Sequence, residues 1–212
     1  MLRPILAALA FSTSLFALPA QAEIRSLIVA GGCFWCVESD FDHMAGVIAT
    51  TSGYAGGTLR DPTYRNHGKH REVVKVDYDA NVTDYRTLVA AFLRTIDPTD
   101  AGGQFCDRGH SYSTAIHANG EAEARIAREE LAKAQEVLGR SVVTPVEALP
   151  AFWEAEEYHQ NYATSQVRQL TRFGLVSRAK AYKGYRKACG RDQRVRQLWM
   201  EEAYSGVNKP GS

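Results

Sequence analysis

Segments with the pattern of strands alternate along the chain with segments that have the pattern of helices, and this alternation limits the fold more than any other feature. Ile24–Ala30 is a short apolar run typical of a buried strand, and Arg71–Asp79 alternates apolar and polar residues. Residues 83–96 and Glu121–Leu138 instead repeat apolar residues at helical spacing. We therefore expect an α/β (α+β) sandwich, in which helices pack on a mixed β-sheet.

The remaining segments extend this prediction. A further helix begins near Cys33, because apolar residues recur at helical spacing from Phe34 onward. Thr83 is the expected cap of the helix over residues 83–96. We also expect strands over residues 46–52, 112–117 and 141–149, a loop over residues 53–69, and a helix over residues 154–168. The chain then becomes basic and polar, so we interpret residues 171–212 as a long irregular C-terminal tail and not as a second domain.

Residues 1–22 have the pattern of a secretory signal peptide. One positive charge, Arg3, precedes an apolar run, and Ala20-Gln21-Ala22 matches an A-x-A cleavage site. An uncleaved membrane anchor is the alternative; no later run approaches the ~18 consecutive apolar residues of a membrane-spanning helix. We expect cleavage after Ala22, a periplasmic or secreted protein, and one domain over residues 23–170.

The charge balance bears on the partners. Arg3 is the one charged residue of the first 22, so the mature chain has 24 basic and 24 acidic side chains. Nucleic acids and anionic membranes require a basic surface. We therefore expect neither partner once the signal peptide is removed, and a monomer in solution.

The four cysteines are Cys33, Cys36, Cys106 and Cys189. In an exported protein, cysteines usually form structural disulfides. The first two form C-x-x-C, however, which is typical of a redox pair or of half a zinc site. Zinc would need a second close pair of ligands, and Cys106 and Cys189 are isolated in sequence. We therefore predict a redox pair and no metal.

Cys33 is the predicted nucleophile. It follows a strand and two glycines and opens a helix, where unpaired backbone N–H groups and the helix dipole favour a thiolate. A thiolate at a helix start is the usual setting of a reactive cysteine. The alternative is a buried half of a structural disulfide.

Glu72 is the predicted acid. It shares strand parity with Val74, Val76 and Tyr78, so its carboxyl points to their apolar side. An apolar environment disfavours the charged form and raises the pKa, which lets the group act as a general acid near neutrality. The alternative is a side chain at the strand edge that reaches water.

The residues around Cys33 resemble the G-C-F-W signature of the MsrA family, the peptide methionine-S-sulfoxide reductases. The similarity extends in order from Leu27 to Tyr162. After GGCFW at residues 31–35, it continues through GYAGG (53–57), DPTY (61–64), GKHREV (68–73), DP (97–98), DRG (107–109), Tyr112 and AEEYHQ (155–160). A lone C-F-W could arise by chance, but this ordered set could not.

The resemblance implies roles for four catalytic residues. Cys33 attacks the sulfoxide sulfur, and Glu72 protonates the sulfoxide oxygen. The hydroxyls of Tyr64 and Tyr112 assist through hydrogen bonds. These roles agree with the residue-level interpretation, because a thiolate can expel the oxygen only when a protonated acid is beside it.

The resemblance also implies four substrate-binding residues. Phe34 and Trp35 form an apolar cage for the substrate methyl group, although Phe34 equally fits the core stripe of its helix. Asp107 and His159 help to bind the methionine backbone and to shape the site.

The resolving cysteine is left open by the sequence. Cys36 stands where glycine follows the tryptophan in the commonest family pattern, one turn from Cys33. Cys189 lies in a tail like those that supply a resolving cysteine in many relatives; we favour Cys36, with further exchange to Cys189 as a second step. Cys106 is either a small buried hydrophobe or a redox partner. Ser111 and Ser113 replace the more usual Gln and Arg, so we expect different pocket contacts there.

The implied function is thiol-dependent reduction of methionine-S-sulfoxide, free or in proteins, through a Cys33 sulfenic acid and an intramolecular disulfide. No bound cofactor is implied. The reducing equivalents should come from a thioredoxin-like donor by thiol–disulfide exchange.

Two other functions compete with this one. A thioredoxin-like disulfide oxidoreductase also has C-x-x-C at a helix start, and Thr144-Pro145 mimics the dipeptide that faces that motif. Thr144 lies 108 positions after Cys36, which is too far for that fold. The other is a binding module stapled by an inert Cys33–Cys36 disulfide, which would leave Glu72 without a purpose.

Overall fold

A six-stranded mixed sheet forms the centre of the protein, whose computed structural model describes residues 21–208. The strand order is β7-β6-β1-β3-β2-β8, and only the β6–β7 pair is parallel. The mixed sheet and the α/β class are confirmed. The bounds are β1 (Ile24–Ala30), β2 (Val47–Ala55), β3 (Arg71–Asp79), β6 (Ala115–Ala118), β7 (Val146–Ala148) and β8 (Phe152–Glu154). The predicted signal peptide lies outside the described residues except for its last two.

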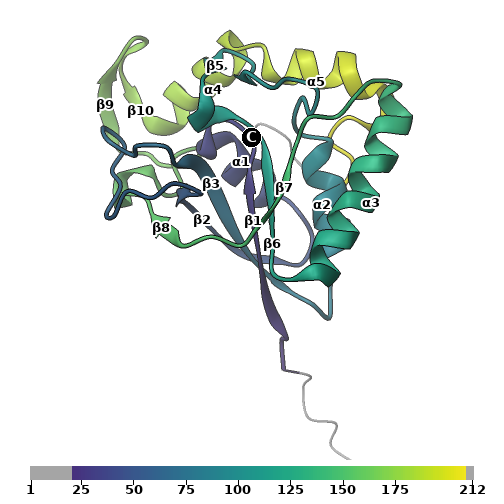
Figure 1. The fold of residues 1–212 in the computed structure, drawn as a ribbon. Coiled ribbons are helices and arrows are strands. Elements are labelled where there is room, and N and C mark those ends of the chain that lie inside the picture. Colours follow the sequence, from purple (N-terminus) through teal and green to yellow (C-terminus); the bar gives the residue numbers. More distant parts are fainter. Residues whose placement is uncertain (1–20, 209–212) are drawn as a thin grey trace, which may run out of the picture.

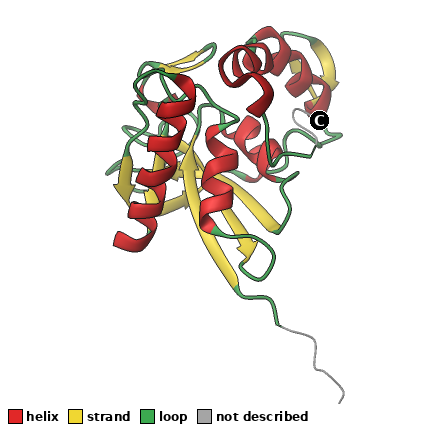
Figure 2. Cartoon of the chain, turned by 90° about the vertical axis from the view of Figure 1, so that its right-hand side faces the viewer, coloured by secondary structure: helices red, strands yellow, loops and turns green. Residues whose placement is uncertain are grey.

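Three helices cover one face of the sheet and build the main core. They are α1 (Phe34–Phe41), α2 (Tyr85–Leu93) and α3 (Glu121–Leu138), and Figure 2 shows the helices gathered over the sheet. Phe41 of α1 stacks on Phe92 of α2, with ring centroids 6.2 Å apart. The core-facing side chains of β1 and β3 meet them. The helical stripes and the strand alternation seen in the sequence thus face one another.

The C-terminal segment is folded, so the prediction of an irregular tail is wrong. It contains a hairpin of β9 (Arg168–Thr171) and β10 (Gly174–Ser177), then α4 (Arg178–Ala188), α5 (Arg191–Trp199) and a short 3-10 turn, η3 (Met200–Glu202). Figure 1 shows α4 and α5 across one end of the molecule, with the hairpin projecting beside α4.

Local signals explain these two helices. The Ser177 hydroxyl accepts a hydrogen bond from the Lys180 N–H and caps α4. Gly190 adopts a φ of 68°, which lets the chain turn between α4 and α5 at low cost. Val195 and Trp199 are then buried in the main core, where the Trp199 indole donates a hydrogen bond to the Ile96 carbonyl. A few apolar residues are enough to dock a mostly polar segment.

Several other boundaries also differ from the predictions. The helix expected over residues 154–168 is wrong, because Phe152–Glu154 pairs with β2 as an edge strand and a 3-10 turn follows, η2 (Glu157–His159). Asp84, not Thr83, caps α2, since its carboxylate accepts the Thr87 N–H. Both strands predicted over residues 112–117 and 141–149 are shorter than expected.

The segment before β6 carries short elements at the upper end of the sheet. These are β4 (Gly103–Gln104), β5 (Asp107–Arg108) and a 3-10 turn, η1 (His110–Tyr112). Across residues 21–208, none of the helices is both long and apolar enough to cross a bilayer.

Candidate active site

Cys33 lies at the point where β1 ends and α1 begins. It is the N-cap residue of α1 and is buried. The two preceding glycines are required by space and backbone: a Cβ on Gly31 would lie 2.8 Å from the Phe92 ring, and Gly32 has a φ of 85°. The glycines therefore set the thiol at the helix start, as predicted.

A cavity of about 60 Å³ opens beside Cys33 and gathers most of the predicted site. Its walls come from α1, the loop after β2, β3, β5, η1 and α4. Seven of the ten predicted site residues line it, namely Cys33, Phe34, Trp35, Tyr64, Glu72, Asp107 and Tyr112. Tyr185 of α4 also lines it, and nothing in the sequence singled out that residue.

Glu72 is buried on β3, with 2% of its surface exposed. Its carboxyl accepts a hydrogen bond of 2.9 Å from the Phe34 N–H, so it lies at the start of α1 next to Cys33. Burial raises its pKa to about 8, against the smaller lowering effect of that hydrogen bond. The edge-strand alternative for Glu72 is excluded, and the group is a protonated acid near neutrality.

The two cysteines of C-x-x-C are free thiols in contact with each other. Burial raises the pKa of Cys33, and the neighbouring Cys36 and Glu72 charges add to the effect. The hydrogen bond from Cys33 lowers the pKa of Cys36 to about 7, with help from the Arg191 and Arg186 charges. This direction runs against the expectation that the helix start favours a Cys33 thiolate, because burial disfavours the charged form of the thiol.

Aromatic rings form one wall of the cavity. The Phe34 and Tyr64 rings stack with centroids 6.3 Å apart, and the Trp35 and Tyr64 rings stack at 6.4 Å. His159 does not line the cavity; it lies behind this wall, where its Nδ1 accepts a 3.2 Å hydrogen bond from the Trp35 indole. Burial lowers the pKa of His159 to about 4, so the ring is neutral and orients Trp35.

Hydroxyl and carboxyl groups also line the cavity. Burial raises the pKa values of Tyr64 and Tyr112, so both hydroxyls remain donors at all ordinary pH values. Burial also raises the pKa of Asp107, although a hydrogen bond from the Tyr185 hydroxyl acts against the shift. The cavity thus offers both apolar surface and hydrogen-bonding groups.

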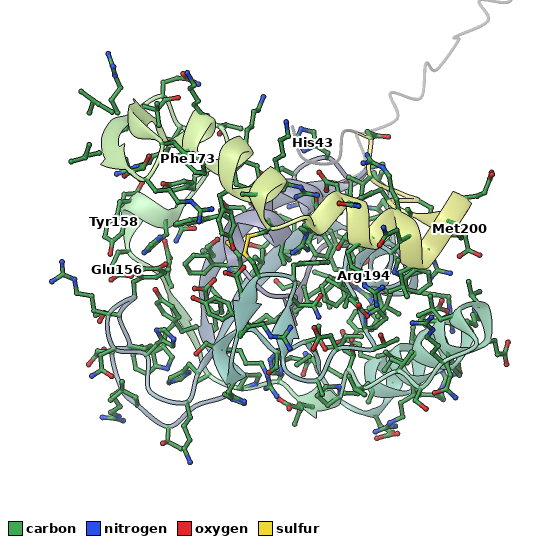
Figure 3. The ribbon with its side chains drawn as sticks, turned by 90° about the horizontal axis from the view of Figure 1, so that it is seen from above. His43, Glu156, Tyr158, Phe173, Arg194 and Met200 are labelled. Atoms are coloured by element: carbon green, nitrogen blue, oxygen red, sulfur yellow. A yellow bond between two sulfur atoms is a disulfide. The ribbon has the colours of Figure 1, made fainter. Side chains whose placement is uncertain are left out.

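Cys106 and Cys189 form a disulfide, visible as a sulfur–sulfur bond in Figure 3. Cys106 is exposed, so its interpretation as a small buried hydrophobe is wrong. The bond ties the β5 strand, which carries Asp107, to the end of α4. Among the described residues, one group of three potential metal ligands is found, Cys106, Asp107 and Cys189, and its two sulfurs are already joined.

Beneath Cys36 lies a buried cluster of charges that sequence reasoning missed. The Asp40 carboxylate pairs with Arg186 at 2.9 Å and with Arg191 at 3.7 Å, and all three side chains are almost fully buried. Arg191 also donates a 3.2 Å hydrogen bond to the Gly31 carbonyl. Its Nε and Nη2 atoms have no hydrogen-bond partner within residues 21–208. Arg186 also pairs with Asp192 at 2.8 Å, so two carboxylates balance the two guanidinium groups. The Arg191 and Arg186 charges nevertheless help to lower the pKa of Cys36.

Comparison with known proteins agrees with this site. Residues 25–196 match the family model described as peptide methionine sulfoxide reductase. A peptide methionine sulfoxide reductase MsrA of Rhizobium meliloti is 49% identical over 199 residues, which cover 92% of this chain and 94% of that protein. One of Bacillus licheniformis is 38% identical, over 74% of this chain and 91% of its own.

The fold is shared as well. The structure of methionine sulfoxide reductase A of Corynebacterium diphtheriae superposes with a TM-score of 0.62 and 31% identity, over 68% of this chain and 76% of that chain. With the catalytic cavity in place, these likenesses settle the family. The chain belongs to the MsrA family of peptide methionine sulfoxide reductases, and it is an enzyme that reduces methionine sulfoxide with its cysteine thiols.

Proposed function

We propose that Cys33 attacks the sulfur of methionine-S-sulfoxide while Glu72 protonates the oxygen. The observation that carries this proposal is the position of Glu72, a buried carboxyl with a pKa of about 8 that faces the same cavity as the Cys33 thiol. The two sulfoxide epimers require different enzymes. Phe34 and Trp35 receive the substrate methyl group, and Tyr64 and Tyr112 hold the oxygen.

The first step moves one oxygen atom between two sulfurs. As Cys33 attacks, its proton passes to the Cys36 sulfur, to which it is already hydrogen-bonded. Glu72 gives its proton to the sulfoxide oxygen, and a transient bond forms between the Cys33 and methionine sulfurs. The oxygen then moves to the Cys33 sulfur as that S–S bond and the methionine S–O bond break, which leaves a Cys33 sulfenic acid. A thiol and a sulfoxide thus become a sulfenic acid and a thioether, so that atoms and electrons balance.

We infer that Cys36 resolves the sulfenic acid. Its sulfur attacks the Cys33 sulfur, an S–S bond forms, the S–O bond breaks and water leaves. The pKa of Cys36, about 7, supports this order, because a thiol whose pKa lies near the ambient pH is the best attacking group. Cys189 is a weaker first resolver, since it is already bonded to Cys106.

The Cys33–Cys36 disulfide must then be reduced from outside. We propose a thioredoxin-like donor that acts by thiol–disulfide exchange. Cys189 relays this exchange only after the donor has reduced its bond to Cys106. The signal-peptide pattern of residues 1–22 supports a periplasmic or secreted enzyme that repairs exported proteins as well as free methionine sulfoxide. In an oxidising compartment a second disulfide such as Cys106–Cys189 persists.

The test is turnover of the resolved S and R epimers by the mature protein with dithiothreitol. We expect consumption of the S epimer alone and a complete loss with Cys33→Ser. Single-turnover assays without reductant should yield one methionine per wild-type chain, with a Cys33–Cys36 disulfide by mass spectrometry. Accumulation of sulfenic acid in Cys189→Ser but not in Cys36→Ser would contradict the proposed order.

A further inference from the structure

A second cavity adjoins the catalytic one, and the C-terminal segment forms it. Its volume is about 140 Å³. Trp35 and Tyr185 line both cavities, so the two share a wall. The remaining lining comes from the turn after η2, from the hairpin and from α4: Tyr162, Thr171, Arg172, Phe173, Ala181 and Tyr182.

The floor of this cavity is rigid and aromatic. The Trp35 and Tyr162 rings stack with centroids 3.8 Å apart and planes within 10°. The Tyr185 ring meets Trp35 edge-on at 6.3 Å. Because Trp35 also borders the catalytic cavity, a ligand that fills this floor lies one ring away from the substrate methyl group.

The hairpin supplies the outer wall. The Phe173 ring lies against α4 at Gly184, where an added Cβ would come within 3.0 Å of the ring, and Figure 3 shows Phe173 beside that helix. The Arg172 guanidinium lies over Phe173 at 4.8 Å and near Tyr185 at 5.7 Å. Among the described residues that line this cavity, Arg172 alone carries a charge. The mouth of the cavity is therefore positive and its interior is mostly apolar.

The two volumes suit different groups. The catalytic cavity, at about 60 Å³, is too small for more than the methylsulfinyl end of the substrate. The second, at about 140 Å³, is close in size to an apolar cavity of about 150 Å³ that accepts benzene. It therefore has room for the side chain of a leucine or a phenylalanine.

We propose that this second cavity is a subsite for the apolar side chain of a residue that flanks methionine sulfoxide in a polypeptide substrate. The inference rests on the proposed action on protein-bound methionine sulfoxide. It follows from the shared Trp35–Tyr185 wall, which makes the two cavities neighbours, so that adjacent residues of one extended chain can enter both. The enzyme then favours oxidised methionines that come from hydrophobic segments, and the Arg172 charge disfavours a flanking lysine.

The experiment compares kcat/KM for blocked dipeptides of methionine-S-sulfoxide with glycine, leucine, phenylalanine or lysine, placed before or after the sulfoxide. We expect leucine and phenylalanine to exceed glycine by about tenfold or more on one side, since even single methylenes discriminate at this level. Phe173→Ala should remove most of that preference. Leu170→Ala is the matched control, because Leu170 lies on the same hairpin, is 83% exposed and does not line the cavity.

Each result has a distinct meaning. Equal kcat/KM for glycine and leucine on both sides overturns the subsite, while turnover of the peptides still supports the reductase. No turnover of any peptide would instead refute the proposed function. A leucine preference that survives both Phe173→Ala and Gly184→Ala, which displaces the ring, would place the subsite elsewhere. The melting temperature of each variant checks that the hairpin change has not unfolded the protein.

Discussion

Replacing Glu72 by glutamine should make the enzyme almost inactive and more stable. Glutamine keeps the shape of the protonated carboxyl and can still accept the Phe34 N–H, but it has no proton to give. Loss of a general acid typically costs about 10²–10⁴-fold in rate. We therefore expect kcat/KM for the S epimer to fall at least 100-fold, roughly in line with that range.

The gain in stability follows from the raised pKa. Glu72 titrates near 8 when folded and near 4.5 when unfolded, so the wild-type protein loses stability as the pH rises from about 4.5 through about 8. Linkage gives a loss of about 1 kcal/mol at pH 5 and about 4 kcal/mol at pH 8. The glutamine variant is free of this loss, so its advantage should grow between these two pH values.

Urea unfolding of the wild type and the variant at pH 5 and pH 8 measures this difference. Glu201→Gln, on the exposed η3 turn and outside the cavity lining, is the matched control. In the wild type, kcat/KM should also decline above pH ~8 as the acid ionises. If Glu72→Gln keeps kcat/KM within roughly threefold of the wild type, the acid role of Glu72 is refuted. A stability gap that is equal at both pH values would refute the raised pKa.

Three further outcomes are expected. Arg191→Met removes a buried positive charge beside Cys36. The pKa of Cys36 should therefore rise by about one unit or more, the usual effect of losing a nearby opposite charge, in a titration that follows thiolate absorbance in the ultraviolet. An unchanged titration would contradict the charge argument. Trp199→Ala should lower the free energy of unfolding by about 3–5 kcal/mol, measured with urea, because the indole is 2% exposed in the core. Cys189→Ser opens the disulfide with Cys106, which closes a loop with a sequence separation of 83, and should cost about 2–4 kcal/mol in non-reducing unfolding.

The sequence alone determined the alternation of elements and the identity of the reacting groups. The bounds of β1, β3 and α3 agree with the predictions to the residue, because each has a strong period and clear ends. The parity of β3 alone placed Glu72 on the apolar side. Cys33 could be singled out because glycines, helix start and cysteine are adjacent in the chain. Such features depend on neighbours a few residues apart, so local reasoning reaches them.

Only the tertiary structure decided how those groups are tuned. The pKa of Cys33 is raised, not lowered, because strands and helices from distant parts of the chain exclude water from it. The buried Arg191 is 155 positions after Cys36 and looks like any surface arginine in the sequence. The C-terminal segment is polar and carries few apolar residues, so its docking through Trp199 left no periodic signal. Burial and long-range charge arise from the packed chain as a whole, and a linear pattern does not encode them.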